Sequence, residues 1–351
     1  MNIKKQIIRF TLLLTVATML FSCSEDDKKE VTRFDSVWVT VNTNADYTIL
    51  AAALKKTGLD LTLSNAGSYT VFAPNNAAFE ASSLPEKTVV AINALVMPAD
   101  AIKIADLRVL LLNHVIGVGT RADDLLTAKY FKTFAFFRAN APVPAVPATA
   151  IIASNATAQM SMFINKVGVD VIINGNAKVT KADIDVSNGI VHMVDKVIAL
   201  PTIFELLSSN PDFAPLMLVV NSADQAAVKT ILTTATNLTS RTLIVPNAAA
   251  FTTATTGAGA FLVGMTPANV TKVLQYHLLG GNRVRGFFLN DFAVFTALPG
   301  VNFRTFTNAP AFRIEDLAIA PRNRVSRFVF NDIQGVNGCL HVVDKVLEPT
   351  L

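Results

Sequence analysis

Histidine is the side chain best suited to acid–base or metal chemistry at neutral pH. The chain has four histidines, and they form two pairs of similar context. His114 and His277 each follow a leucine-containing segment, whereas His192 and His341 lie in Asn-Gly segments that end in Asp-Lys-Val. Such pairing predicts a structural role in which ring nitrogens are hydrogen-bonded inside the fold. A metal site built from His114 and His192 is the alternative, although no third ligand accompanies them at equivalent positions.

A hydrolase would need a nucleophile, a base and an orienting acid, and Ser187, His192 and Asp195 are the nearest approach to this set. The matching position of Ser187 in the second Asn-Gly segment is Val336. On a strand, positions 192 and 195 point to opposite faces, so Asp195 would not orient His192. The sequence also contains no G-x-S-x-G, P-loop or H-E-x-x-H motif. We therefore expect no enzymatic activity, no cofactor and no metal site.

Cysteine offers equally little chemistry. Cys339 occupies the position that Ile190 holds in the other Asn-Gly segment, which predicts a buried, inert thiol. The only other cysteine is Cys23, near the N-terminus, so a disulfide scaffold or a Cys-rich zinc module is excluded.

Arginine is concentrated in one part of the chain. Between positions 283 and 327 there are seven arginines, no lysine and three acidic residues. The tightest group is Arg322, Arg324 and Arg327, of which the first two share a face on a strand. Because arginine recognises carboxylate and phosphate in a planar, bidentate way, this group predicts a site for an acidic glycan or headgroup. The alternative is a set of solvated positions scattered over several faces.

The elements that position these residues occur twice. Three sequence blocks recur in the same order: 69–79 with 241–251, 111–117 with 274–280, and 188–197 with 337–346. In the third block, seven of ten residues are identical. The repeat predicts two domains of one kind, residues 31–200 and 201–351. The first copy has additional loop, most readily placed in the proline-rich stretch 139–148.

Each block indicates local structure. Residues 69–73 predict a strand ended by Pro74, and Asn75 and Asn247 are predicted N-caps of the helices that follow. Residues 37–41 have a strand-like composition, whereas 47–56 predict a helix. Residues 107–115 indicate a helix end or a buried strand. Asn188-Gly189 predicts a tight turn between strands near 169–173 and 190–198, and Asn337-Gly338 is its counterpart.

Composition excludes further classes. With 51% hydrophobic and 16% charged residues the chain is not disordered. Beyond residue 22, 27 basic residues face 26 acidic ones, so the charge does not predict a nucleic-acid partner.

The N-terminus resembles an export signal. Residues 1–22 combine early positive charge with an apolar run too short to span a membrane, which predicts a signal peptide. The run ends at Ser22-Cys23, which resembles a bacterial lipobox and predicts lipid attachment at Cys23; an ordinary signal with a chance cysteine is the alternative. Residues 23–30 are polar and acidic and predict a flexible tether. Together they predict a lipoprotein of a Gram-negative outer membrane, displayed on the cell surface.

The repeated blocks, with Leu-x-x-His and Asn-Gly-x-x-His-x-x-Asp-Lys-Val in both copies, resemble the fasciclin-like domain. The resemblance implies an α+β fold of two tandem domains, each a β-wedge or sandwich flanked by short helices. It also implies that the four histidines, Asn188, Gly189, Asn337 and Gly338 are structural.

Such domains usually act outside cells in adhesion or ligand binding. The resemblance therefore implies a surface-anchored, non-catalytic lipoprotein that binds matrix, polysaccharide, a protein ligand or another cell. An accessory subunit of an outer-membrane glycan-capture complex is the alternative. Tyr276-His277 resembles a pair tied to receptor adhesion in animal members, although Tyr276 would equally serve as a core-facing aromatic.

Overall fold

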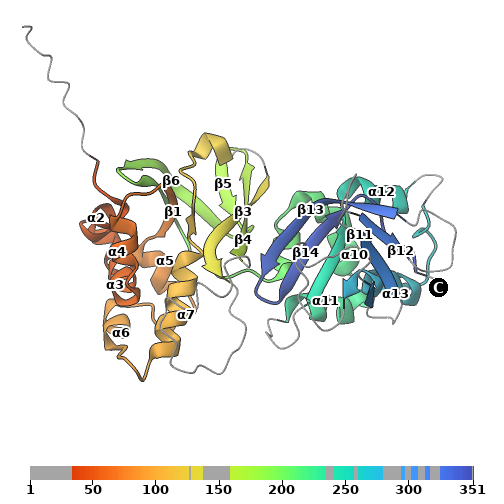
Figure 1. Ribbon diagram of the computed structural model, residues 1–351, viewed down its shortest axis with the longest axis horizontal. Coiled ribbons are helices and arrows are strands. Elements are labelled where there is room, and N and C mark those ends of the chain that lie inside the picture. The colour runs from red at the N-terminus through yellow and green to blue at the C-terminus, as the bar shows by residue number, and fades with distance from the viewer. Residues whose placement is uncertain are drawn as a thin grey trace, which may run out of the picture. The chain divides into compact units, whose positions relative to one another are not determined.

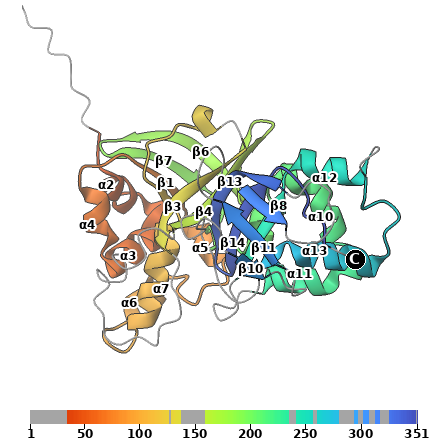
Figure 2. The ribbon, with the colours of Figure 1, turned by 45° about the vertical axis from the view of Figure 1, so that its right-hand side comes forward.

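The computed structural model describes residues 34–125, 128–136, 159–234, 241–256, 260–279, 294–296, 302–306, 313–316, 325–349 and 351. For 294–296, 302–306 and 316 it describes the backbone alone. The described chain contains two sheets, each accompanied by short helices (Figures 1 and 2). The predicted α+β fold is therefore confirmed.

The first domain is built around a closed barrel of seven strands. Its strands are β1(Tyr69–Pro74), β2(Val115–Ile116), β3(Lys129–Phe136), β4(Gln159–Val167), β5(Asp170–Ile173), β6(Ala177–Val186) and β7(Gly189–Val194). Its helices are α2(Val37–Asn42), η1(Ala45–Tyr47), α3(Thr48–Thr57), α4(Leu59–Ser64), α5(Asn76–Glu80), α6(Val89–Ala94), α7(Ala101–Leu112) and η2(Ala122–Leu125).

The second domain has a seven-stranded sheet in the order β10-β11-β12-β13-β14-β8-β9. Its strands are β8(Arg241–Pro246), β9(Leu278–Leu279), β10(Val294–Thr296), β11(Asn302–Phe306), β12(Arg313–Asp316), β13(Val325–Gly335) and β14(Gly338–Val343). Its helices are α9(Ile203–Ser208), η3(Pro211–Phe213), α10(Ala214–Val220), η4(Ala223–Gln225), α11(Ala226–Thr233), α12(Ala248–Thr255) and α13(Pro267–Tyr276).

The repeated sequence blocks form the same parts of both sheets. β1 pairs in parallel with β7, and β8 pairs in the same way with β14. Each of these parallel pairs joins the first sequence block to the third, so it brings together segments more than 90 residues apart. The predicted N-caps are confirmed, since the Asn75 and Asn247 side chains accept hydrogen bonds from the amides of Ala78 and Ala250.

Two local predictions are wrong. Residues 37–41 form helix α2 instead of a strand, because the Ser36 side chain caps the helix and Val37 and Val41, one turn apart, bury the same face. The Asn188-Gly189 turn joins β6 to β7, so the strand before the turn is Ala177–Val186 and not 169–173. The Val186↔Gly189 register places the turn directly between these two strands.

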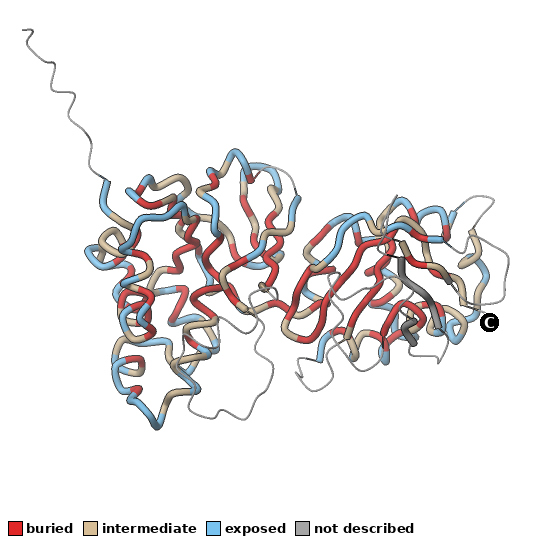
Figure 3. The backbone as a smooth tube through the Cα atoms, in the orientation of Figure 1, coloured by how far each residue is buried: buried red, intermediate tan, exposed pale blue. Residues whose placement is uncertain are grey.

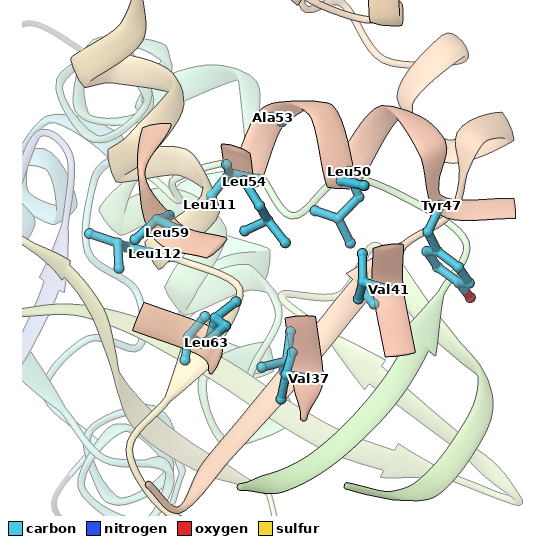
Figure 4. Close-up of a cluster of buried hydrophobic side chains, with 14 of the residues drawn as sticks. Val37, Val41, Tyr47, Leu50, Ala53, Leu54, Leu59, Leu63, Leu111 and Leu112 are labelled. Atoms are coloured by element: carbon cyan, nitrogen blue, oxygen red, sulfur yellow. The ribbon is translucent and has the colours of Figure 1, made fainter. Parts of the chain in front are cut away.

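The first domain has two clusters of buried residues, one that joins its helices to the barrel and one formed mainly by residues of the barrel strands. Figure 4 shows Val37 and Val41 of α2, Leu50 and Leu54 of α3, and Leu111 of α7 among the side chains of the first of these clusters. The buried residues follow the strands and the inner helix faces in both domains (Figure 3). Burial of apolar surface on this scale is the main source of stability.

Candidate functional site

His114 and His277 connect the end of a helix to a distant part of their own domain. The Nδ1 atom of His114 lies 2.9 Å from the Leu110 carbonyl oxygen, and its Nε2 accepts a hydrogen bond of 2.9 Å from the Ile198 amide. His277 repeats this arrangement with the Val273 carbonyl and the Leu347 amide. Burial lowers the pKa of both rings to about 4, so they are neutral at pH 7.

His192 and His341 lie within the strands that follow the two Asn-Gly turns. The Nδ1 atom of His192 accepts a hydrogen bond from the Asp183 amide, and Nε2 lies 2.9 Å from the Thr120 carbonyl oxygen. The His341 Nδ1 atom accepts from the Asp332 amide in the same way. Desolvation lowers the pKa of His192. In all four histidines, therefore, backbone groups of the same domain fix the imidazole ring.

The serine hydrolase arrangement does not assemble. The Asp195 carboxylate accepts a hydrogen bond of 2.7 Å from the Lys178 amide and thereby links β7 to β6. Asp195 therefore does not orient His192. The ring nitrogens of His192 contact the Asp183 amide and the Thr120 carbonyl oxygen instead. Among the described residues, no group of three or more His, Cys, Asp or Glu is placed to hold a metal ion.

Cys339 and His341 form a close pair inside the second domain. The Cys339 Sγ atom lies 3.7 Å from His341 Nε2 and 3.5 Å from the Thr242 hydroxyl. Both Cys339 and His341 are fully buried. A thiol enclosed in this way is inaccessible to a substrate from solvent, in contrast to reactive cysteines, which are partly exposed.

Asn188 and Asn337 each hold three segments together. The Asn188 Oδ1 atom accepts from the Val37 amide, and its Nδ2 donates to the carbonyls of Leu63 and Asn65. Asn337 makes the equivalent bonds, at 2.8 Å to the Ile203 amide, 2.8 Å to the Leu232 carbonyl and 3.1 Å to the Thr234 carbonyl.

The glycine after each asparagine allows two strands to approach closely. A Cβ atom on Gly189 would lie 2.0 Å from the Tyr69 carbonyl oxygen, and one on Gly338 would lie 2.3 Å from that of Arg241. The Asn-Gly pairs therefore tie the parallel strand pair to the helices in both domains.

Among the described residues, the structure brings Arg313 and Arg327 together. They lie directly opposite each other on the antiparallel strands β12 and β13. Their neighbours Ile314 and Ser326 are buried, so alternation places the two arginines on the outer face of the sheet, where Arg327 is exposed and Arg313 half-buried. We call the outer positions 313, 315, 325 and 327 the β12–β13 face. Both arginines belong to the group of seven between positions 283 and 327, but the sequence did not indicate that these two would be opposite each other.

The register extends this face toward β11. Arg304 lies opposite Glu315, and Glu315 in turn lies opposite Val325. Like charges directly opposite each other destabilise a sheet. Arg313 and Arg327 are such a like-charge pair. The two guanidinium groups are therefore suited to bind one anion whose oxygens both of them can reach.

Other predicted site residues are placed differently. Tyr276 is fully buried, so its side chain is core-facing and does not form part of a ligand-contacting surface. Arg322 and Arg324 lie outside the described residues, as do Arg283, Arg285 and Cys23.

An apolar surface is present on the first domain, where sequence reasoning indicated no site. Val96 and Met97 lie in the turn between α6 and α7, and Val90 and Ile102 lie on those two helices. Each of the four is more than half exposed. The Asp100 carboxylate accepts a hydrogen bond from the Val96 amide and fixes the turn. Within the described part of the chain, none of the helices has the length and hydropathy to cross a membrane.

Comparisons with known proteins agree with the internal repeat. The fasciclin domain family model matches residues 45–201 and 217–349. The chain is similar to transforming growth factor-beta-induced protein ig-h3 of Sus scrofa, with 22% identity over 331 residues. That alignment covers 93% of this chain and 40% of the pig protein, so the chain spans well under half of that relative.

Two further similarities are shorter or more distant. Protein sll1483 of Synechocystis sp. is 30% identical over 158 residues, which cover 45% of this chain and 69% of the cyanobacterial protein. The structure of a FAS1 domain pair from the insect cell adhesion molecule fasciclin I aligns with a TM-score of 0.48 at 17% identity, covering 86% of this chain and 95% of that one.

Proposed function

Because the chain belongs to the fasciclin domain family, we propose that it is a non-catalytic binding protein whose second domain recognises acidic polysaccharide. Fasciclin domains are typically involved in adhesion and binding, and the four histidines of this chain are held in hydrogen bonds within their own domains. The observation that carries the ligand class is the direct opposition of Arg313 and Arg327 on the β12–β13 face.

The chemistry of this face favours carboxylate or sulfate groups on a polymer. Charge-assisted hydrogen bonds from guanidinium to carboxylate contribute about 1.5–3 kcal/mol each, with the lower end expected at an exposed site. Such contacts are weak singly, and repeated units of a polysaccharide add strength by multivalency.

The test is binding of the full chain to alginate, with neutral dextran as the comparison polymer, at 50 and 300 mM NaCl. We expect alginate binding that weakens with salt, and at least a tenfold loss in the variant R313E/R327E. The matched control K55E/K181E makes the same change in net charge at two exposed lysines of the first domain. Equal losses in the two variants, or equal binding to dextran, would contradict the proposal.

We further propose that Cys23 carries a lipid that anchors the chain in the outer membrane of a Gram-negative bacterium. The support is the sequence of residues 1–30, in which a short apolar run ends at Ser22-Cys23 and a polar segment follows. Two or three acyl chains give firm anchoring. Cells supplied with labelled palmitate should label the wild-type chain and not the variant Cys23→Ser. Equal labelling of both would refute the anchor.

The exposed apolar side chains between α6 and α7 favour a second candidate function, as an accessory subunit that docks on an outer-membrane protein. Exposed apolar patches are typical of protein contacts, and four exposed apolar side chains occur within residues 90–102. A photo-reactive residue at position 97 should crosslink one defined partner in intact cells, and the same residue at the exposed position 169 should not. Crosslinking of the same partner from both positions would remove this candidate.

A further inference from the structure

An apolar cavity of about 130 Å³ lies within the second domain. Its walls come from α10, α11, α12, α13 and β8. Two polar side chains reach it, and both are satisfied. The Thr255 hydroxyl donates to the Phe251 carbonyl, and both ring nitrogens of neutral His277 are hydrogen-bonded to backbone. An apolar cavity of this kind does not stabilise water.

The internal repeat allows the lining of the cavity to be compared with the core of the first domain. The two domains can be superposed residue by residue through their equivalent hydrogen bonds: His114 with His277, and Asn188 with Asn337. In this alignment, four buried leucines of the first domain correspond to valines that line the cavity. The pairs are Leu54 with Val220, Leu59 with Val228, Leu107 with Val270, and Leu110 with Val273.

Each of these exchanges removes one methylene group from the second domain. Other lining positions have the larger side chain in the second domain, and these are Leu207, Val219, Leu243, Val245 and Leu278, which correspond to Val41, Ala53, Val71, Ala73 and Val115. The aliphatic lining side chains of the second domain are therefore shorter on α11 and α13, the two helices that carry Val228, Val270 and Val273.

A helix of the first domain also has no counterpart among the described residues of the second. Helix α6 places Ile92, fully buried, in the core beside α3, and the Lys56 ammonium donates to the carbonyls of Asn93 and Leu95. The chain from Phe79 to His114 is 35 residues long, whereas that from Phe251 to His277 is 26. The second domain therefore has nine residues fewer in this connection, where Leu262, between α12 and α13, lines the cavity.

We propose that the second domain binds one small, uncharged, apolar molecule in this cavity, of the size of a single aromatic ring or a short alkyl chain. The size follows from the volume, since an engineered cavity of about 150 Å³ lined by aliphatic and aromatic side chains binds benzene or xenon. The absence of charge follows from the lining, in which the polar groups already have partners. This site is separate from the β12–β13 face and adds a second binding activity to the one proposed above.

Benzene is the first probe, and its binding to the full chain is measured by calorimetry. We expect saturable binding of one benzene per chain. At about five times the dissociation constant, benzene should raise the unfolding temperature of the second domain by about 2–4 °C. The alkyl series tests the size limit, because n-hexane should bind and n-dodecane should not.

The first domain prescribes the variant that fills the cavity. V228L/V270L/V273L introduces the leucines found at the equivalent positions and should weaken benzene binding at least tenfold. V270L alone should give an intermediate loss, and it replaces the triple variant if far-UV circular dichroism shows that the latter does not fold. The matched control Val169→Leu adds the same methylene at an exposed site and should bind like the wild type.

Three results would overturn the proposal. The first is benzene uptake that does not saturate. The second is a folded triple variant with unchanged affinity. The third is n-dodecane binding as tightly as n-hexane, which would show that the cavity volume does not limit the ligand.

Discussion

Replacement of Asn188 by alanine tests how far the first domain depends on one polar side chain. The Asn188 side chain is buried and bonds to the Val37 amide at 2.9 Å, the Leu63 carbonyl at 2.7 Å and the Asn65 carbonyl at 2.8 Å. A typical hydrogen bond contributes about 1 kcal/mol net, and a buried group left without a partner costs about 1–3 kcal/mol. We therefore expect Asn188→Ala to lower the free energy of unfolding by about 3 kcal/mol or more.

The assay uses the single tryptophan of the chain. Trp38 packs against the core of the first domain, so its fluorescence during urea denaturation reports that domain. Asn93→Ala is the matched control, because Asn93 is exposed and its change should stay within about 0.5 kcal/mol. A loss for Asn188→Ala within 1 kcal/mol of that for Asn93→Ala would refute the reasoning that three segments depend on this amide.

Three other predictions concern single positions. Because burial lowers the pKa of His114 from 6.5 to about 4, the unfolded chain takes up a proton that the folded chain does not as the pH falls below 6.5. The free energy of unfolding should therefore decrease by up to about 3 kcal/mol between pH 6.5 and pH 4, as measured from urea denaturation midpoints. A His114 ring that titrates near pH 6.5 in the folded chain would contradict this prediction. Gly189→Ala should prevent β1 and β7 from pairing, because its Cβ would lie 2.0 Å from the Tyr69 carbonyl oxygen and its φ is +154°. A soluble variant with a native circular dichroism spectrum would show that the two strands do not approach each other this closely. Ile92→Ala should cost about 2–5 kcal/mol by Trp38 fluorescence, since it empties a fully buried site, and a loss below 1 kcal/mol would mean that the core closes around the gap.

Prediction from the sequence succeeded where a few adjacent residues determine the local structure. The caps at Asn75 and Asn247 are encoded by a few adjacent residues, and both form as predicted. The strand prediction for residues 37–41 failed because the cap at Ser36 and the burial of Val37 and Val41 against the core outweighed the β-branched composition. Intrinsic strand preference is a weak term when packing favours another conformation.

The candidate binding face shows the limit of reading along the chain. Arg322, Arg324 and Arg327 are close in sequence, whereas the arginine pair that the sheet forms among the described residues is Arg313 with Arg327. Strand register depends on pairing between distant segments, and a shift of one residue would turn each arginine to the other face. A sequence contains this information only when the partner strand is known.

The sequence by itself determined the two-fold repeat, the family resemblance, the paired histidines and the Asn-Gly segments, because each is a local pattern present in both copies. The tertiary structure decided what those patterns do: which backbone groups hold His114 and His277, and which segments Asn188 and Asn337 join. It also decided where the second domain is underfilled. A cavity is a difference between the volume of many side chains and the space that their helices enclose, and that difference exists only after the chain has folded.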